Sequence, residues 1–247
     1  MGERKEWIYG RHPVAEALRT GRRRCFQIRL AEGTATKGVV GEILALAQQA
    51  EVPVQRVPRR TLDSLGANHQ GVAARVQPYP YTNAAEVLQR AAQRERGRVL
   101  VLDRIQDPRN LGAMLRSAEA MGVQGVILPL RGAAGVTPAV VRASAGASEH
   151  LAIARANLAQ ALRALKEAGF WIYGLAVEAE AQPLLTVRAA PATALVVGSE
   201  GEGMRRLVRQ SCDTLVRIPM RGRVASLNAA VAASIAMYAL WMAGEGA

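Results

Sequence analysis

Three glycine-rich or polar segments follow predicted buried strands in the second half of the chain. "DRIQDPRNLGAMLRS" comes after "RVLVL", "GSEGEGM" comes after "ALVV", and "IPMRGRVASLNAAVAAS" comes after "TLVR". In open parallel sheets, ligands bind beside the carboxyl ends of the strands, so these three segments are candidate site loops. The last segment carries glycine and arginine but no His, Cys or carboxylate, and therefore offers a ligand no metal-binding side chains.

The segment "GSEGEGM" places glycines at a strand-to-helix turn but is not a dinucleotide fingerprint. The chain has neither G-x-G-x-x-G after its first strand nor G-x-x-x-x-G-K-[ST]. Glu200 and Glu202 stand between the glycines, and two carboxylates would repel a pyrophosphate. The turn therefore favours a ligand with neutral or cationic groups.

The elements that must position these loops alternate between strand and helix. The second half predicts strands "RVLVLD", "GVILP", "ALVV" and "TLVR", and a helix over 111–121, which indicates a mostly parallel sheet covered by helices on both faces. The first half predicts a smaller α/β unit with helices over 13–19, 39–49 and 60–65 and strands "CFQIRL", "VPVQRV" and "GVAARV". We expect a first domain over 1–76, a linker and lead-in helix over 77–95, and a second domain over 96–247.

Composition points to a polyanionic partner. The 247 residues carry a formal net charge of +12, which favours nucleic acid over other partners, although a generally Arg-rich surface is an alternative. The two cysteines, Cys25 and Cys212, are far apart, so we expect neither a disulfide nor a zinc site, and a reducing cytoplasm. The apolar run from Ala229 to Ala243 is shorter than the ~20 residues that span a membrane, so no membrane association is expected.

The loop segments carry a family resemblance. "NLGAMLRSAEAMG", "LVVGSEGEGM" and "IPMRGRVASLNAAVAAS" resemble, in order, the three motifs of the SpoU class of the SPOUT superfamily, which are S-adenosylmethionine-dependent RNA ribose 2′-O-methyltransferases. "YGRHPVAEAL" and "HQGVAARV" resemble the RNA-binding domain, similar to ribosomal protein L30, that is fused to many members. The resemblance covers nearly the whole chain and is strongest to the bacterial enzymes that methylate a guanosine of 23S ribosomal RNA.

This resemblance implies a fold and a partner that periodicity could not indicate. It implies an α/β fold in which the C-terminal parallel-sheet SPOUT domain contains a deep trefoil knot and follows a small L30-like α/β domain. It also implies a homodimer through the C-terminal domain, to which the apolar helix predicted after Ser226 would contribute. Deleting the first 76 residues is then expected to leave a folded dimer that still binds cofactor.

Site residues follow from the same motifs. The resemblance implies that S-adenosylmethionine lies against backbone groups around Gly198, Ile218 and Leu227. The catalytic polar set that it implies consists of Asn110, Arg116, Glu200, Ser226 and Asn228. No metal is expected.

The reaction would remove a weakly acidic proton from a ribose 2′-hydroxyl. Because an arginine gives up its proton very reluctantly, we expect Arg116 to act by gripping a phosphate and stabilising the forming alkoxide, rather than as a base. Glu200 could orient Arg116 or attract the sulfonium and amine of the cofactor. Ser226 and Asn228 also suit the N-cap of the following helix, so we expect a joint role.

Arg22, Arg23 and Arg24 form a cationic cluster in the first domain, for which phosphate contact and a solvated turn are the alternatives. We favour phosphate contact. Three other functions remain open: a transfer-RNA ribose methyltransferase, a resistance-type ribosomal methyltransferase, and a non-catalytic ribosome-associated RNA-binding protein.

Overall fold

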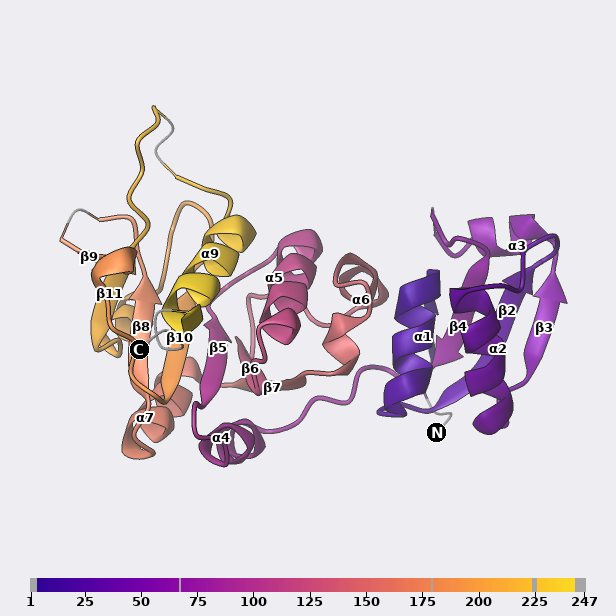
Figure 1. The fold of residues 1–247 in the computed structure, drawn as a ribbon, viewed down its shortest axis with the longest axis horizontal. Coiled ribbons are helices and arrows are strands. Elements are labelled where there is room, and N and C mark those ends of the chain that lie inside the picture. The colour runs from indigo at the N-terminus through magenta and orange to yellow at the C-terminus, as the bar shows by residue number, and fades with distance from the viewer. Residues whose placement is uncertain (1–3, 67, 179, 224–225, 243–247) are drawn as a thin grey trace. The chain divides into compact units, whose positions relative to one another are not determined.

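A computed structural model describes residues 4–66, 68–178, 180–223 and 226–242, which fall into two compact units (Figure 1). The first unit contains the chain up to Pro80 together with Gly135–His150. The second contains Tyr81–Ala134 and the chain from Leu151 onward. Each unit has its own sheet.

The first unit is built on a mixed four-stranded sheet of order β1-β4-β2-β3. Strand β4 pairs antiparallel with β1 and β2, and β2 pairs parallel with β3. The strands are β1 (Glu6–Tyr9), β2 (Cys25–Ala31), β3 (Val54–Val57) and β4 (Val72–Val76), and the helices between them are α1 (Arg11–Thr20), α2 (Val39–Gln49) and α3 (Arg59–Asp63). The small α/β unit predicted from the sequence is present, with β1 as an additional strand.

The helices of this unit follow local sequence signals. Gly21 adopts φ 57°, a left-handed conformation that ends α1 as a C-terminal glycine commonly does. Along α2, Val40, Ile43 and Ala47 recur at the spacing of one helix face and are fully or almost fully buried. These buried faces supply the apolar contacts that hold α1 and α2 together.

A short segment from the middle of the sequence completes the first unit. Helix α6 (Pro138–Ala143) and the 3₁₀ turn η1 (Ala147–Glu149) contact β1 and α1. Gly146 sits at φ 89°, and a Cβ there would lie 2.8 Å from the Cβ of Glu16, so the close approach requires glycine. The compact units therefore differ from the contiguous domains 1–76 and 96–247 that the sequence led us to expect, because residues 135–150 are packed with the N-terminal part.

The second unit contains a seven-stranded sheet of order β7-β6-β5-β10-β8-β11-β9. All of its strand pairs are parallel, as the alternation of strands and helices predicted. The strands are β5 (Arg98–Leu102), β6 (Gly125–Pro129), β7 (Ala152–Ala156), β8 (Trp171–Leu175), β9 (Gln182–Pro183), β10 (Thr193–Val197) and β11 (Thr214–Arg217).

Helices cover this sheet on both faces. The helices and the 3₁₀ turn of the unit are α4 (Ala84–Ala92), α5 (Pro108–Ala120), α7 (Leu158–Glu167), η2 (Leu184–Thr186), α8 (Arg206–Gln210) and α9 (Ala229–Met242). Val99 and Val101 of β5 share a core with apolar residues of α4 and α7. Because neighbouring residues of a strand face opposite sides, the buried Leu100 and Leu102 lie on the other face.

Helices α5 and α9 contact each other, and α9 contacts the central strand β10 (Figure 1). Helix α4 lies in the segment expected to be a linker and lead-in, but its Val87 and Ala91 are fully buried in the core of the second unit. No helix within the described ranges is both long and apolar enough to cross a membrane.

Candidate active site

Three of the predicted catalytic residues meet at one point in the second unit. Glu200 Oε1 accepts hydrogen bonds from Asn110 Nδ2 at 3.2 Å, from Asn228 Nδ2 at 2.7 Å and from the main-chain N–H of Ala229 at 3.0 Å. Asn228 Nδ2 also donates to Asn110 Oδ1 at 3.0 Å. We call Asn110, Glu200 and Asn228 the polar cluster. One carboxylate oxygen with three donors is held in a defined position.

Local sequence places the two asparagines at helix starts. Asp107 accepts from the main-chain N–H of Arg109 at 2.8 Å and Pro108 is the first residue of α5, so Asn110 lies in the first turn. Asn228 Oδ1 accepts from the N–H groups of Ala230 at 2.9 Å and Val231 at 3.3 Å, and therefore caps α9. The capping role that we considered for both Ser226 and Asn228 belongs to Asn228 in the structure.

Ser226 lies two residues before that cap and is exposed, as is Glu200. The preceding Val224 and Ala225 of the third motif lie outside the described residues. The N-terminal end of α9 carries partial positive charge, which favours a carboxylate such as Glu200 at this place. The polar cluster thus joins three segments that are far apart in the sequence.

A tight glycine turn carries Glu200 away from the end of β10. Ser199 and Gly203 exchange main-chain hydrogen bonds of 3.2 and 3.0 Å across the turn. A Cβ on Gly198 would clash with the main chain of Gly203 and Met204. Gly201 and Gly203 adopt φ values of 82° and 66°, which glycine tolerates and most residues do not. The three glycines are therefore required by the geometry of the turn.

A cavity of about 430 Å³ lies at the carboxyl ends of β8, β10 and β11. Gly198, Ile218 and Leu227, the three predicted cofactor positions, all line it. Its rim also includes Glu200 and Ser226. We call this cavity the cofactor pocket. The structure therefore brings the second and third motifs to one ligand-sized space at the edge of the sheet that parallel sheets use for ligands.

Other residues of this pocket were not predicted. The pocket is also lined by Leu175, which ends β8, by the residues 176–178 that follow it, and by Met204, Arg209 and Met220. Arg209 is ion-paired with Glu178, and Glu202, which also lines the pocket, is ion-paired with Arg104 at 2.6 Å. Glu200 therefore supplies the lining carboxylate that forms no ion pair with the described residues. The segment "WIYGLAVE" could have indicated these positions, because it is a predicted strand that ends near a polar residue. Its composition, however, does not distinguish it from strand ends that bind no ligand.

Arg116 stands apart from the polar cluster. It is exposed, and none of the residues that the structure describes forms an ion pair with it. On α5 it lies six residues after Asn110, roughly 120° around the helix axis. Ser117, seven residues after Asn110, faces α9 instead, and its Oγ lies 2.7 Å from Ser234 Oγ. The alternative in which Glu200 orients Arg116 by a direct ion pair is therefore not the arrangement observed.

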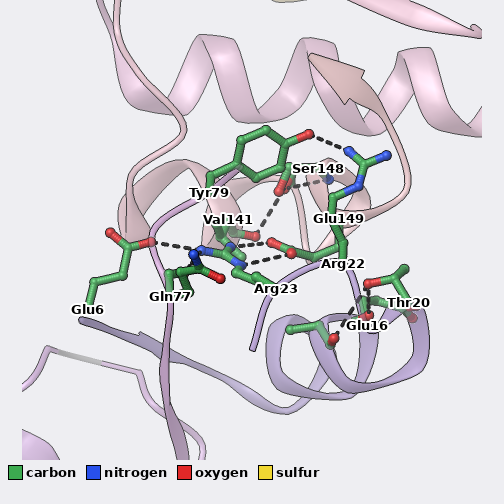
Figure 2. A network of polar contacts seen from close by, with 12 residues as sticks. Glu6, Glu16, Thr20, Arg22, Arg23, Gln77, Tyr79, Val141, Ser148 and Glu149 are labelled. Atoms are coloured by element: carbon green, nitrogen blue, oxygen red, sulfur yellow. Dashed lines mark hydrogen bonds and ion pairs between the residues drawn. The ribbon is translucent and has the colours of Figure 1, made fainter. Parts of the chain in front are cut away.

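The predicted cationic cluster of the first unit divides into three different environments. The Arg23 side chain is completely buried and forms a bidentate ion pair with Glu149 (Figure 2). Arg23 Nε donates to Glu149 Oε2 at 2.9 Å, and Nη2 donates to Oε1. Its Nη1 also contacts Glu6 Oε1 at 2.8 Å and the carbonyl of Gln77 at 3.2 Å. Although burial opposes it, the ion pairs raise the pKa of Arg23 above its ordinary value.

Burial removes Arg23 from the candidates for direct phosphate contact, because its donors are already used inside the unit. Arg22 is half-buried and donates to the hydroxyl of Tyr79 at 2.5 Å (Figure 2), and burial raises the pKa of Tyr79 to about 12. Arg24 is exposed, with its guanidinium 5.1 Å from the centre of the Phe26 ring. Arg24 is the member of the cluster whose position best suits phosphate contact.

Among the residues that the structure describes, no group of three or more His, Cys, Asp or Glu side chains is arranged to hold a metal ion. Cys25 and Cys212 are free thiols. The polar groups on the lining of the cofactor pocket are main-chain groups, carboxylates, the hydroxyls of Ser199 and Ser226 and the guanidinium of Arg209.

Comparison with known proteins decides what this arrangement represents. Residues 97–238 match the SpoU rRNA methylase family, and residues 7–82 match the RNA 2′-O ribose methyltransferase substrate-binding family. The chain belongs to the SpoU methylase family. A Bacillus subtilis protein assigned to the TrmH family of tRNA/rRNA methyltransferases is 38% identical over 244 residues, which cover 98% of this chain and 97% of that protein.

Solved structures of SpoU family members have the same fold. The SpoU methyltransferase AviRb of Streptomyces viridochromogenes, in complex with AdoMet, superposes with a TM-score of 0.79 at 25% identity, covering 96% of this chain and 90% of that one. An AdoMet-bound rRNA methyltransferase of Sinorhizobium meliloti also gives 0.79 at 25% identity, covering 96% and 87%. This SpoU protein is thus an S-adenosylmethionine-dependent RNA 2′-O-ribose methyltransferase, and the non-catalytic alternative is not retained.

The lining of the cofactor pocket fits S-adenosylmethionine. Gly198, Ile218 and Leu227 offer main-chain and apolar surface, which suits a neutral adenine ring. Glu200, which forms no ion pair with the residues that the structure describes, supplies negative charge that suits the sulfonium and the amine of the methionine part, whereas Glu202 is paired with Arg104.

Proposed function

We propose that this SpoU protein methylates the 2′-hydroxyl of one ribose in 23S ribosomal RNA, and that the nucleotide is a guanosine. The observation that carries the site is the convergence of Gly198, Ile218 and Leu227 in one pocket bordered by Glu200. Support for an RNA target comes from the net charge of +12 and the match to a substrate-binding domain.

Residues of the cofactor pocket would hold S-adenosylmethionine, which supplies a methyl group activated by the sulfonium. Glu200 attracts the positive charge of this group through its carboxylate. Asn110 and Asn228 fix that carboxylate by the hydrogen bonds of the polar cluster. Ser226, exposed on the pocket rim, is placed to contact either the cofactor or the ribose.

Arg116 would act on the RNA. Because its guanidinium is exposed and has no ion-pair partner among the described residues, it is available to bind the phosphate next to the reactive ribose. A fixed positive charge there stabilises the alkoxide that forms as the 2′-hydroxyl loses its proton. We therefore assign Arg116 an electrostatic role rather than that of a proton acceptor.

A homodimer through α9 is part of the proposal. Val231, Ile235 and Tyr238 are 48%, 41% and 59% exposed and recur at the spacing of one helix face. Such a stripe of large apolar side chains is costly in water, and a second copy of the same helix would bury it.

The proposal includes a trefoil knot in the C-terminal domain and an L30-like fold for the first unit. Strand β10 lies between β5 and β8 although it follows both in sequence, an arrangement compatible with a threaded chain. The mixed four-stranded sheet flanked by α1 and α2 is compatible with an L30-like domain. We place the protein in the cytoplasm, where its free cysteines would stay reduced.

Transfer RNA is the second candidate substrate, because the Bacillus subtilis relative is described as a tRNA/rRNA methyltransferase. Purified protein and S-adenosylmethionine with a tritiated methyl group would be incubated with unmodified 23S, 16S and transfer RNA transcripts, followed by mapping of 2′-O-methylated nucleotides. We expect label in 23S ribosomal RNA at one guanosine. Label in transfer RNA alone would replace the proposed substrate, and label on a base would contradict ribose methylation.

A further inference from the structure

A second cavity opens at the carboxyl edge of the same sheet, beside β6 and β7. It has a volume of about 680 Å³ and is lined by Pro129–Arg131, Ala156–Ala159 and Arg205–Val208. Pro129 and Ala156 are register partners at the ends of the two parallel strands, and Arg205–Val208 follow the glycine turn. We call this cavity the basic groove.

The groove carries positive charge that the protein does not neutralise completely. Arg131, Arg205 and Arg206 line it, and none of its described lining residues is acidic. The fully buried Asp103 accepts from the main-chain N–H and Nε of Arg205, both at 2.8 Å, which fixes and neutralises that arginine. Arg131 and Arg206 are exposed and have no ion-pair partner among the described residues. Two guanidinium groups therefore remain available to an anion.

The start of α7 adds to this preference for an anion. Asn157 and Leu158, at the N-terminal end of this ten-residue helix, line the groove. The Asn157 side chain accepts from the N–H of Gln160 at 3.2 Å, and the partial positive charge of the helix end faces the same region as the arginines. The groove thus combines a helix N-terminus, fixed and free guanidinium groups, and a defined cavity.

Exposed leucines supply apolar surface beside these charges. Leu130 and Leu207 are 59% and 61% exposed, and both line the groove. A phosphodiester chain presents both kinds of surface, with charged phosphates beside the less polar faces of sugar and base. The two unneutralised arginines favour such a chain over an apolar protein partner, for which the charges would have to be buried unpaired.

The groove and the cofactor pocket lie along one edge of the sheet. Met204 lines the cofactor pocket and the next residue, Arg205, lines the groove. The β6/β7 pair is three strand positions from the β10/β8 pair, about 14 Å at the usual strand spacing. A polynucleotide with one ribose at the pocket could therefore place a phosphate of a flanking nucleotide, beyond the adjacent one, in the groove.

We propose that the basic groove binds a phosphodiester of the RNA substrate that flanks the methylated nucleotide, beyond the phosphate assigned to Arg116. This inference rests on the proposed RNA methylation and adds a substrate-positioning site outside the cofactor motifs. Arg131 and Arg206 bind the phosphate, and Arg205 is a rigid part of the wall. The groove selects for a continuous chain rather than for a particular base.

The test uses Arg131→Glu, Arg206→Glu and the double variant of the full-length protein. RNA affinity for unmodified 23S, 16S and transfer RNA transcripts would be measured at several salt concentrations, together with kcat, KM for RNA and calorimetric affinity for S-adenosylmethionine. We expect each single variant to raise the RNA Kd at least tenfold. The salt slope should fall by about 0.7 for each single-stranded phosphate contact that is lost. Cofactor affinity and kcat at saturating RNA should stay within about twofold of the wild type.

Arg163→Glu is the matched control, because Arg163 is exposed on α7, makes the same charge change and does not line the groove. Equal weakening by this control would assign the effect to overall charge and overturn the groove site. Unchanged RNA affinity in the groove variants would also overturn it. Loss of dimerisation in sedimentation, with RNA affinity kept, would assign the groove to a protein contact. A wild type that binds RNA but methylates none would refute the proposed function while leaving the groove measurement valid.

Discussion

The carboxylate of Glu200 and the side-chain amide of Asn228 are joined by a 2.7 Å hydrogen bond that closes the site between the glycine turn and the start of α9. Asn228→Asp should break it by placing two carboxylates in contact, while an aspartate still caps the helix. We expect methyl transfer to fall about 10²-fold, as for loss of a fixed electrostatic contact, and stability to fall by only ~1 kcal/mol.

The double variant Glu200→Gln with Asn228→Asp tests whether the geometry of this bond matters. The glutamine amide could donate to the new carboxylate, so thermal stability should return toward the wild type even if activity stays low. No recovery of stability in thermal denaturation would show that the two side chains are not coupled.

Arg116→Ala should lower methyl transfer by about 10²-fold or more while leaving the Kd for S-adenosylmethionine nearly unchanged, because Arg116 is outside the cofactor pocket. Arg116→Lys should restore little of the lost methyl transfer, since an ammonium group cannot reproduce the planar, bidentate hydrogen bonding of a guanidinium. Arg109→Ala, an exposed change on the same helix, serves as the control. A parallel loss of cofactor affinity in calorimetry would contradict the assigned role.

The ion pair between Arg23 and Glu149 should be necessary for the first unit. Neither side chain is exposed, so Arg23→Met leaves a buried carboxylate without its partner and should cost about 3–5 kcal/mol of the free energy of unfolding. The double variant Arg23→Met with Glu149→Leu should be less destabilised than Arg23→Met alone. Urea denaturation measures both, and equal stability of Arg23→Met and the wild type would be incompatible with a buried pair.

Removal of the N-terminal residues should have a different result from the one that the motifs imply. A chain starting at Tyr81 would expose the faces of α6 and η1 that pack on β1 and α1, and Glu149 would lose Arg23. We expect this truncation to aggregate or to unfold at lower temperature. A second truncation that also replaces residues 135–150 by a short Gly-Ser linker should recover solubility and cofactor binding. If the first truncation aggregated less than the second in gel filtration, residues 135–150 would not depend on the N-terminal residues for their packing.

The apolar stripe of α9 predicts a dimer that single charges can break. Ile235→Glu or Tyr238→Glu should give monomers in sedimentation at micromolar concentration, because a buried unpaired carboxylate opposes association. Leu185→Glu offers a control, since Leu185 is 83% exposed outside α9. Dimers that persist in both α9 variants would place the interface elsewhere.

Regular elements were predictable because their signals are local. The predicted bounds of α2, Val39–Gln49, and of the strand "GVILP" agree with the structure, since helical spacing and a continuous apolar run suffice to define them. Strand β1 (Glu6–Tyr9) was not predicted, because four residues in a charged context show no clear alternation. The predicted helix after Ser226 begins at Ala229, one residue after its asparagine cap.

The site was predictable in composition but not in arrangement. The motifs named Asn110, Glu200 and Asn228, and the structure brings them together. They could not show that Arg116 faces away from this cluster. From the sequence "RRR" we favoured phosphate contact over a solvated turn for all three arginines, yet Arg23 is buried because a carboxylate 126 residues later in the chain reaches it. Such long-range pairing leaves no local pattern.

Residues 135–150 make completion of the first unit dependent on the order of synthesis. Glu149 leaves the ribosome 69 residues after Pro80. At about 5–20 residues per second, Arg23 waits roughly 3–14 s for its partner. During that interval the β1 and α1 surfaces that will receive α6 and η1 are open, and much of the second unit's sequence emerges before they close. The nascent first unit therefore stays incomplete until translation has passed α5 of the second unit and has reached η1.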